Sequence, residues 1–287
     1  MRRRIGRGPR RACQKTVPRA PLGAMGVIDT ALGTVGVAEQ GGGERAPILF
    51  LHGVGSDKNV WRPQLEHFGR SRRALAFDFP GYGESSPVAG DTDRDSVAAI
   101  FLAALDALGI ERAHICGLSL GGVMAIAMHA AAPQRCASLV LADSFAAHPQ
   151  GPAILERSVE ASRTLGMRAL AEQRAPLLLA PGTSETVRRE VIETMAAIDP
   201  QAYRTAARAV WLADQRERAA QIDVPTLVLV GDLDPVTPPA LSADLAALVP
   251  GARLGEIAGA SHIANLDQPA EFSRLVDVFV SETEAIS

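Results

Sequence analysis

Short apolar runs alternate with helix-like stretches along the chain from about residue 25 onward. The runs Ile48 to Leu51 and Thr226 to Val230 have the length of single strands. This pattern predicts eight strands, at about 27–31, 34–39, 47–52, 73–78, 113–118, 137–142, 225–231 and 252–257. Because strands that alternate with helices form a mostly parallel sheet flanked by helices, the predicted fold class is α/β.

Helical periodicity between these runs predicts helices at about 58–69, 93–109, 120–132, 239–249 and 268–281. Asp267, two residues ahead of Pro269, is a plausible start for the last of them. The stretch 145–218 interrupts the alternation, since it has helical spacing and no convincing strand. We therefore predict a core formed by 25–144 and 219–287, with 145–218 inserted as a helical cap.

Residues 1–24 differ from the rest in charge, with eight basic side chains and no acidic one. Subtracting these eight charges from the formal net charge of −3 leaves −11 for the remainder. An acidic body argues against nucleic acid as a partner. No apolar stretch follows Arg2 and Arg3, as an export signal would require, so we expect 1–24 to be a disordered extension.

Composition places the remaining chain among globular proteins, with 47% hydrophobic and 21% charged residues in a total of 287. No apolar run approaches the roughly 20 residues that cross a bilayer, so we expect no membrane partner. The three cysteines form no C-x-x-C pair, which suits a reducing cytoplasm. No His or Cys pair has metal-ligand spacing, and we expect neither a metal nor a cofactor. Oligomeric state is left open.

The sequence Gly117-Leu-Ser-Leu-Gly121 matches G-x-S-x-G, the turn that exposes a nucleophilic serine between a strand and a helix. An apolar strand is predicted before it and a helix after it, as that turn requires. A serine hydroxyl needs a nearby base and an acid that orients the base. Ser119 is therefore the candidate nucleophile.

His262 is the candidate base, because it follows the last predicted strand and precedes the last helix. Two acids, Asp232 and Asp234, follow the preceding strand. We assign the triad to Asp234 and expect Asp232 to bond backbone N–H groups two residues on. Asp143, after the sixth strand, is the first alternative acid.

An oxyanion needs two backbone N–H donors, one after the nucleophile and one in an earlier loop. Leu120 and Val54 are in those positions. The glycines at 53 and 55 also suit a plain tight turn. A phosphate-binding loop is improbable there, since neither glycine-rich fingerprint is complete.

The chain resembles the α/β-hydrolase superfamily, and within it the 3-oxoadipate enol-lactonases and related small bacterial esterases. The resemblance covers about 26–283 and rests on LHGVGS at 51–56, DFPGYGES at 78–85, GLSLGG at 117–122, GDLDPVTPP at 231–239 and GASHIANLDQPAEF at 259–272. It implies the triad Ser119, Asp234 and His262 and the oxyanion donors Val54 and Leu120. The expected activity is hydrolysis of a small-molecule carboxylic ester or lactone.

Two other functions fit the same residues: carbon–carbon bond hydrolysis of ring-cleavage products, and ligand reception without catalysis. Trp211 and Phe145 are candidate substrate contacts between cap and core, although packing of the cap would use them equally well. The cap has ten arginines against nine acidic residues, while the core has eleven basic and 23 acidic residues. Either an anionic substrate or solvated helix faces explains that difference.

Overall fold

The computed structural model describes residues 25–87 and 93–286. In this part of the chain the predicted eight-stranded, mostly parallel sheet is confirmed, with the order β1-β2-β4-β3-β5-β6-β7-β8. Its strands are β1 (Met25–Thr30), β2 (Gly33–Gln40), β3 (Ile48–Leu51), β4 (Ala74–Phe77), β5 (Ala113–Leu118), β6 (Cys136–Ala142), β7 (Thr226–Gly231) and β8 (Arg253–Ile257). The predicted fold class is therefore correct.

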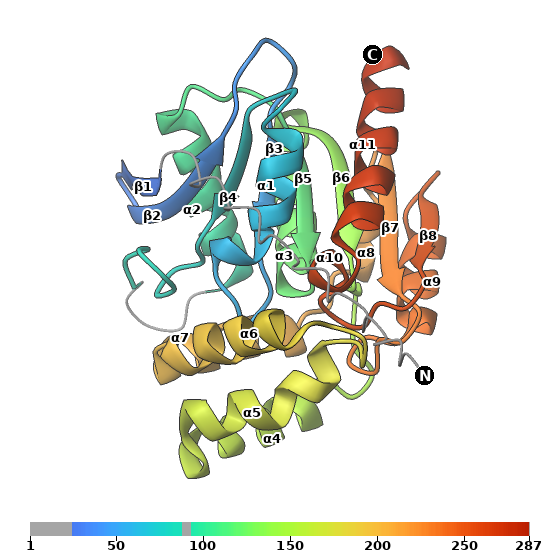
Figure 1. Cartoon of the computed structure of the whole chain (residues 1–287). Coiled ribbons are helices and arrows are strands. Elements are labelled where there is room, and N and C mark those ends of the chain that lie inside the picture. Colours follow the sequence, from blue (N-terminus) through green and yellow to red (C-terminus); the bar gives the residue numbers. More distant parts are fainter. Residues whose placement is uncertain (1–24, 88–92, 287) are drawn as a thin grey trace, which may run out of the picture.

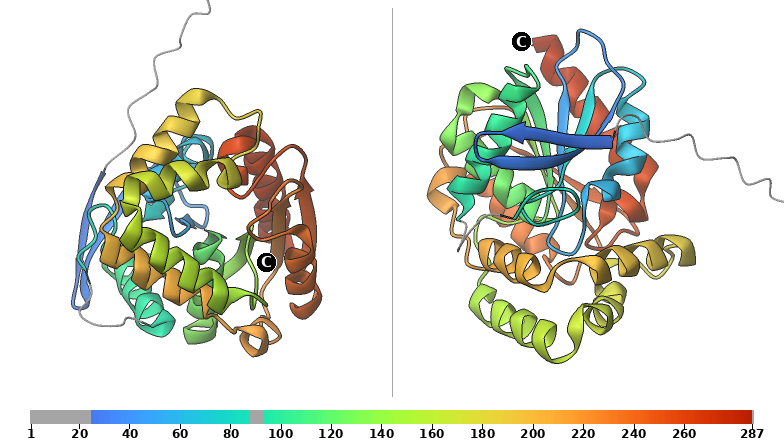
Figure 2. Two further views of the ribbon diagram at one scale, coloured as in Figure 1. Left: turned by 90° about the horizontal axis from the view of Figure 1, so that it is seen from below. Right: turned by 90° about the vertical axis from the view of Figure 1, so that its left-hand side faces the viewer.

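The sheet is antiparallel only at one edge, where β1 pairs with β2 and β2 with β4. The right-hand view of Figure 2 shows this edge hairpin in blue, crossing in front of the other strands. From β4 to β8 every pair is parallel. Strands β3 to β7 are buried along their whole length, which explains why they appear in the sequence as continuous apolar runs.

Helices cover both faces of the sheet (Figure 1). The helices α1 (Arg62–Phe68) and α11 (Pro269–Ile286) pack together on one face, while α2 (Arg94–Ala107) and α3 (Leu120–Ala131) pack together on the other. Two more core helices are α9 (Pro239–Leu248) and the short α10 (Ala264–Asp267). Short 3₁₀ segments occupy η1 (Lys58–Trp61) and η2 (Pro133–Arg135).

The helix predicted over 58–69 is divided in two, at η1 and α1. Asp57 caps the first part by accepting from the N–H of Asn59 at 2.8 Å. Pro63 has no N–H to donate to the carbonyl of Asn59 four residues earlier, so one continuous α-helix cannot form.

Five helices follow β6 before the chain returns to the sheet at β7. They are α4 (Gly151–Thr164), α5 (Gly166–Leu178), α6 (Glu185–Ala197), α7 (Pro200–Trp211) and α8 (Arg216–Ala219). The left-hand view of Figure 2 shows α4 to α7 lying across one end of the sheet. An isolated bridge between Ala147 and Asp214 joins the two ends of this insertion.

We propose 145–218 as the cap and 25–144 with 219–287 as the core. Helix α8 spans the proposed boundary at 218. The predicted extension 1–24 lies outside the described residues. Among those residues, no helix combines the length and the apolar character that crossing a membrane demands.

Candidate active site

Ser119 stands at the junction of β5 and α3 with a φ of 55°, a left-handed value that is rare outside glycine. The glycines on either side make this turn possible. A Cβ on Gly117 would collide with the backbone of Gly121, and a Cβ on Gly121 would collide with the backbone of Leu51. The G-x-S-x-G spacing is thus a packing requirement for holding the serine at the end of β5.

The structure brings Ser119, His262 and Asp234 together from three separate loops. The Oγ atom of Ser119 lies 3.1 Å from Nε2 of His262, and Nδ1 of His262 lies 2.8 Å from Oδ2 of Asp234. All three side chains are buried. Because the carboxylate accepts a hydrogen bond from the N–H at Nδ1, Nε2 is left with a lone pair that faces the hydroxyl of Ser119.

Asp234 is held by several donors besides the histidine. Its Oδ1 accepts from the N–H groups of Val236 and Thr237 at 2.7 and 3.0 Å, and its Oδ2 accepts from the hydroxyl of Thr237 at 2.6 Å. Burial by itself raises the pKa of Asp234, but His262 and these hydrogen bonds outweigh it and hold the pKa below its ordinary value. Sequence reasoning missed Thr237, although its position three residues after the acid was a usable signal.

The other two candidate acids bond to backbone N–H groups instead. Asp232 is exposed, and its carboxylate accepts from the N–H of Gly259 at 2.7 Å. Asp232 therefore bonds to the loop after β8. The expectation that it bonds N–H groups two residues on is not met by this contact. Asp143 is fully buried at the end of β6 and accepts from the N–H of Gly231 at 2.8 Å. Burial, and then the charge of Asp234, raises the pKa of Asp143 well above its ordinary range.

Leu120 and Val54 both lie beside Ser119. Leu120 is the first residue of α3, where backbone N–H groups have no acceptor within the helix. Val54 belongs to the loop after β3 that lines the same compartment as Ser119 and His262. Both positions are suited to donating toward a negative oxygen at the serine.

The loop that carries Val54 is fastened by two side chains that sequence reasoning missed. The N–H of Phe79 donates to Nε2 of His52 at 3.2 Å, so Nδ1 carries the proton and donates to the carbonyl of Gly53 at 2.8 Å. Since the N–H and C=O of a trans peptide point in opposite directions, this bond turns the N–H of Val54 away from His52. The hydroxyl of Tyr82 holds the next carbonyl, that of Val54, at 2.7 Å.

Lys58 fastens the far end of the same loop. Its ammonium lies 2.7 Å from a carboxylate oxygen of Asp78 and 2.7 Å from one of Glu84, and only 2% of the side chain is exposed. Burial lowers the pKa of Lys58, but the hydrogen bonds with Asp78 and Glu84 outweigh it and raise the pKa above its ordinary value. These two carboxylates neutralise the ammonium, so Lys58 is poorly suited to binding a phosphate.

A compartment of about 30 Å³ surrounds the reactive atoms, which is room for one or two waters. Trp211, one of the two candidate substrate contacts, lines it. Phe145 does not. It is fully buried and stacks on Trp211 with ring centroids 5.8 Å apart, so it supports the tryptophan from behind. The cap adds lining residues that sequence reasoning missed: Arg174, Leu178, Met195 and Tyr203.

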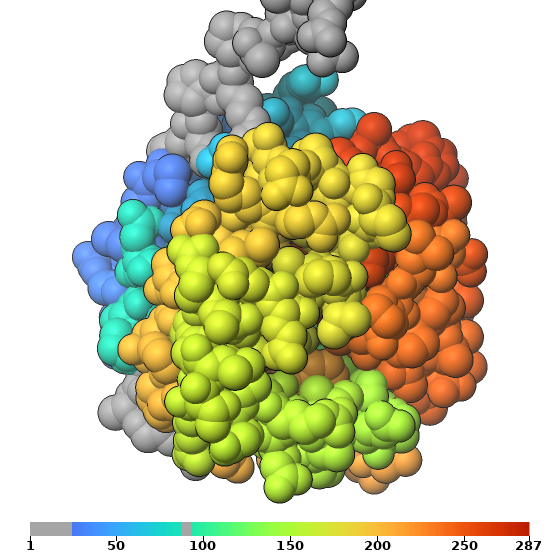
Figure 3. Space-filling view, turned by 60° about the horizontal axis from the view of Figure 1, so that its bottom comes forward, coloured from blue at the N-terminus to red at the C-terminus, as the bar shows by residue number. Residues whose placement is uncertain are grey.

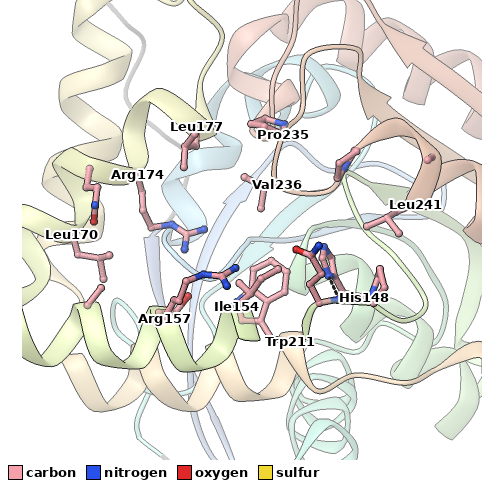
Figure 4. A pocket seen from close by; sticks show the side chains of 17 residues that line it. His148, Ile154, Arg157, Leu170, Arg174, Leu177, Trp211, Pro235, Val236 and Leu241 are labelled. Carbon is pink, nitrogen blue, oxygen red and sulfur yellow. Dashed lines mark hydrogen bonds between the residues drawn. The ribbon is translucent and has the colours of Figure 1, made fainter. Parts of the chain in front are cut away.

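A larger cavity of about 680 Å³ shares Arg174 and Trp211 with that compartment. It lies between α4, α5 and the loop that follows β7, where the surface is hollowed (Figure 3). Figure 4 shows side chains from these elements converging on it. We call it the outer chamber. Its size is typical of a small-molecule site.

Known proteins resemble this chain over most of its length. 3-Oxoadipate enol-lactonase 1 of Acinetobacter baylyi is 30% identical over 246 residues, or 85% of this chain and 92% of that protein. A pimeloyl-[acyl-carrier protein] methyl ester esterase of Neisseria meningitidis is 28% identical over 242 residues, or 81% and 93%. The enol-lactonase structure from Burkholderia xenovorans superposes with a TM-score of 0.85 at 28% identity, covering 89% of this chain and 100% of that one.

The sequence model of the family described as alpha/beta hydrolase fold matches residues 46–269. This span includes Ser119, Asp234 and His262. The eight-stranded sheet, the strained serine after β5 and the helical insertion after β6 all lie within or around that span. The chain belongs to the α/β-hydrolase fold family.

Proposed function

We propose that the protein is a serine hydrolase that cleaves a carboxylic ester or a lactone through an acyl-enzyme on Ser119. The observation that carries the proposal is the series of hydrogen bonds from Ser119 through His262 to Asp234. Ser119 and His262 line a compartment that the cap helps to enclose. An enol-lactonase and a methyl ester esterase among the relatives support this substrate class.

The proposed reaction assigns one task to each residue. Oγ of Ser119 attacks the carbonyl carbon while Nε2 of His262 takes the hydroxyl proton and later delivers it to the leaving oxygen. Asp234 keeps His262 in the reactive tautomer and stabilises its cation. The N–H groups of Val54 and Leu120 donate to the oxyanion. A water then attacks the acyl carbon while His262 takes its proton. His262 returns that proton to Oγ of Ser119 as the bond from Oγ to the acyl carbon breaks and the acid leaves.

Ser119→Ala tests the mechanism. The smaller side chain fits the turn, so the variant should fold with an unchanged melting temperature. Turnover of a short activated ester should fall at least about 10³-fold, because nothing else can attack the carbonyl. A fluorophosphonate probe should label the parent protein and leave the variant unlabelled. Near-normal turnover by the variant would refute the mechanism.

A substrate panel separates the alternatives. Short acyl esters and carboxylate-bearing lactones should be hydrolysed by the parent protein. Ring-cleavage diketo acids should be turned over more slowly; if they are the better substrates, the carbon–carbon hydrolase is the correct function. A compound that raises the melting temperature without turnover of any panel member points to a ligand receptor.

We also propose a cytoplasmic location. Cys116 and Cys136 are both free and buried. Burial raises the pKa of the Cys136 thiol to about 12, so it persists as an unreactive thiol. Disulfides are rare in reducing compartments, which is consistent with free thiols.

A further inference from the structure

Two arginines of the cap face the outer chamber, Arg157 from α4 and Arg174 from α5. Figure 4 shows both guanidinium groups extending into the cavity. None of the residues that line the chamber is an aspartate or a glutamate. Two fixed positive charges are therefore directed at a space whose walls provide no negative charge.

Three other arginines of the cap form close ion pairs with acidic residues. Bidentate or close ion pairs join Arg168 to Glu193, Arg216 to Asp214, and Arg218 to Asp95. Within the described residues, neither Arg157 nor Arg174 has such a partner, and Arg174 is half-buried. Placing a half-buried guanidinium without a counter-ion is unfavourable, and an anion in the chamber would offset that cost.

The remaining walls of the chamber are mostly apolar. Ile154, Leu170 and Leu177 come from the cap, while Val236 and Leu241 come from the core. A hydrocarbon chain fits such walls, and a carboxylate fits the two guanidinium groups, which bind it through paired N–H donors. Arg174 also lines the compartment that contains Ser119 and His262, so the chamber begins next to the reactive atoms.

We propose that the outer chamber binds the far end of the substrate, an apolar chain of several carbons that ends in a carboxylate held by Arg157 and Arg174. This proposal rests on the proposed hydrolase function, because it describes the part of an ester or lactone that lies away from Ser119. Arg157 and Arg174 are then specificity-determining residues for anionic substrates.

A matched pair of substrates tests the site: the mono-4-nitrophenyl ester of suberic acid, and the same ester with its free carboxylate replaced by a carboxamide. The parent protein should prefer the carboxylate about 10- to 100-fold in kcat/KM, the range expected for charge-assisted hydrogen bonds. In the double variant Arg157→Gln and Arg174→Gln the preference should fall to about threefold or less, mainly through KM.

Arg163→Gln is the control. Arg163 is an exposed arginine on α4 that does not line the chamber, so its loss removes the same charge and should leave the preference unchanged. The proposal is wrong if the parent protein hydrolyses both esters equally well. It is also wrong if Arg163→Gln lowers the preference as much as the double variant does, since general charge would then explain it.

Binding to Ser119→Ala separates this proposal from the proposed function. Calorimetry should show that this variant binds the carboxylate ester more tightly than the carboxamide, and that adding the two arginine substitutions abolishes the difference. If the parent protein hydrolyses neither ester while this binding difference holds, the hydrolase assignment fails and the anion site stands. Equal binding of the two esters overturns the anion site.

Discussion

Asp232 and Asp234 are two residues apart at the end of β7, and their carboxylates have different surroundings. Asp234 is buried and bonded to His262, whereas Asp232 is exposed and bonded to the backbone of Gly259. The same chemical change at the two positions therefore tests whether the observed geometry is the catalytic one.

We expect Asp234→Asn to lower kcat/KM on an activated ester by about 10⁴-fold. The NH₂ group of the asparagine can face His262 and favour the tautomer with its proton on Nε2. In that tautomer His262 cannot accept the proton of Ser119. Asp232→Asn keeps an oxygen that can accept from Gly259, so a change below about tenfold is expected. The reverse ranking would assign the triad acid to Asp232.

Asp143 gives a third test at this scale. Its pKa is raised well above the ordinary value, first by burial and then by the charge of Asp234, and both causes favour the neutral acid. Asparagine is neutral, tolerates the φ of 45° found here and can accept from the N–H of Gly231. We expect Asp143→Asn to keep kcat/KM within about fivefold between pH 6 and 8. A loss as large as that of Asp234→Asn would make Asp143 the catalytic acid.

A charged cluster around Glu284 joins helix α11 to the end of the sheet that lies away from Ser119. The carboxylate of Glu284 accepts from Arg72 and Arg45, and it lies 3.3 Å from Nε2 of His114 on β5. Burial raises the pKa of Glu284, but the two arginines outweigh burial and hold it at about 2. Burial and the charge of Arg72 lower the pKa of His114 to about 4.

These shifts make the fold sensitive to acid. His114 takes up its proton near pH 6.5 in the unfolded chain and near pH 4 in the folded one, so stability is lost as the pH falls between these values. Between pH 7 and 5 this loss amounts to about 1–2 kcal/mol. For Glu284 the loss comes at lower pH, between its ordinary value near 4.5 and about 2.

We expect His114→Gln to remove about 1–2 kcal/mol from the difference in unfolding free energy between pH 7 and pH 5, measured by urea denaturation. The glutamine can still reach Ser138 and Glu284, so the variant should fold. An unchanged pH dependence in His114→Gln would show that the sensitivity arises elsewhere.

Asp267 shows how an element boundary can be misread. It was expected to start the last helix, but its carboxylate accepts from the N–H groups of Ala180 and Ser261 at 3.0 and 2.8 Å and from the hydroxyl of Thr183. It therefore joins the cap to the loop that carries His262. Helix α11 begins instead with the N–H of Phe272 bonded to the carbonyl of Gln268.

At the scale of the whole molecule, the basic stretch 1–24 is the part that we expect to be dispensable. It contains eight basic residues and no apolar pattern that could pack onto the core. A chain that begins at Met25, the first residue of β1, should match the full chain in kcat/KM and in melting temperature. Thermal unfolding and ester turnover of the two chains provide the measurement. A melting temperature lower by several degrees would assign a structural role to 1–24.

The strands and most helices could be predicted from the sequence because apolar periodicity and backbone preference are local properties. β5 and α3, for example, lie within one residue of their predicted limits. The glycines around Ser119 could be recognised for a similar reason, since a sharp strand-to-helix turn permits few residue types. His262 and Asp234 could be proposed from chain order, which the resemblance to a known family supplies.

Only the tertiary structure decided which distant groups meet. It placed Asp234 rather than Asp232 against His262, put Phe145 behind Trp211, and brought Arg157 and Arg174 to one chamber. Such meetings depend on how helices and loops far apart in the chain pack, and each side chain alone fits several environments. Local sequence therefore determined the elements and the chemistry available at their ends, while packing of the cap on the core determined the shape and charge of the site.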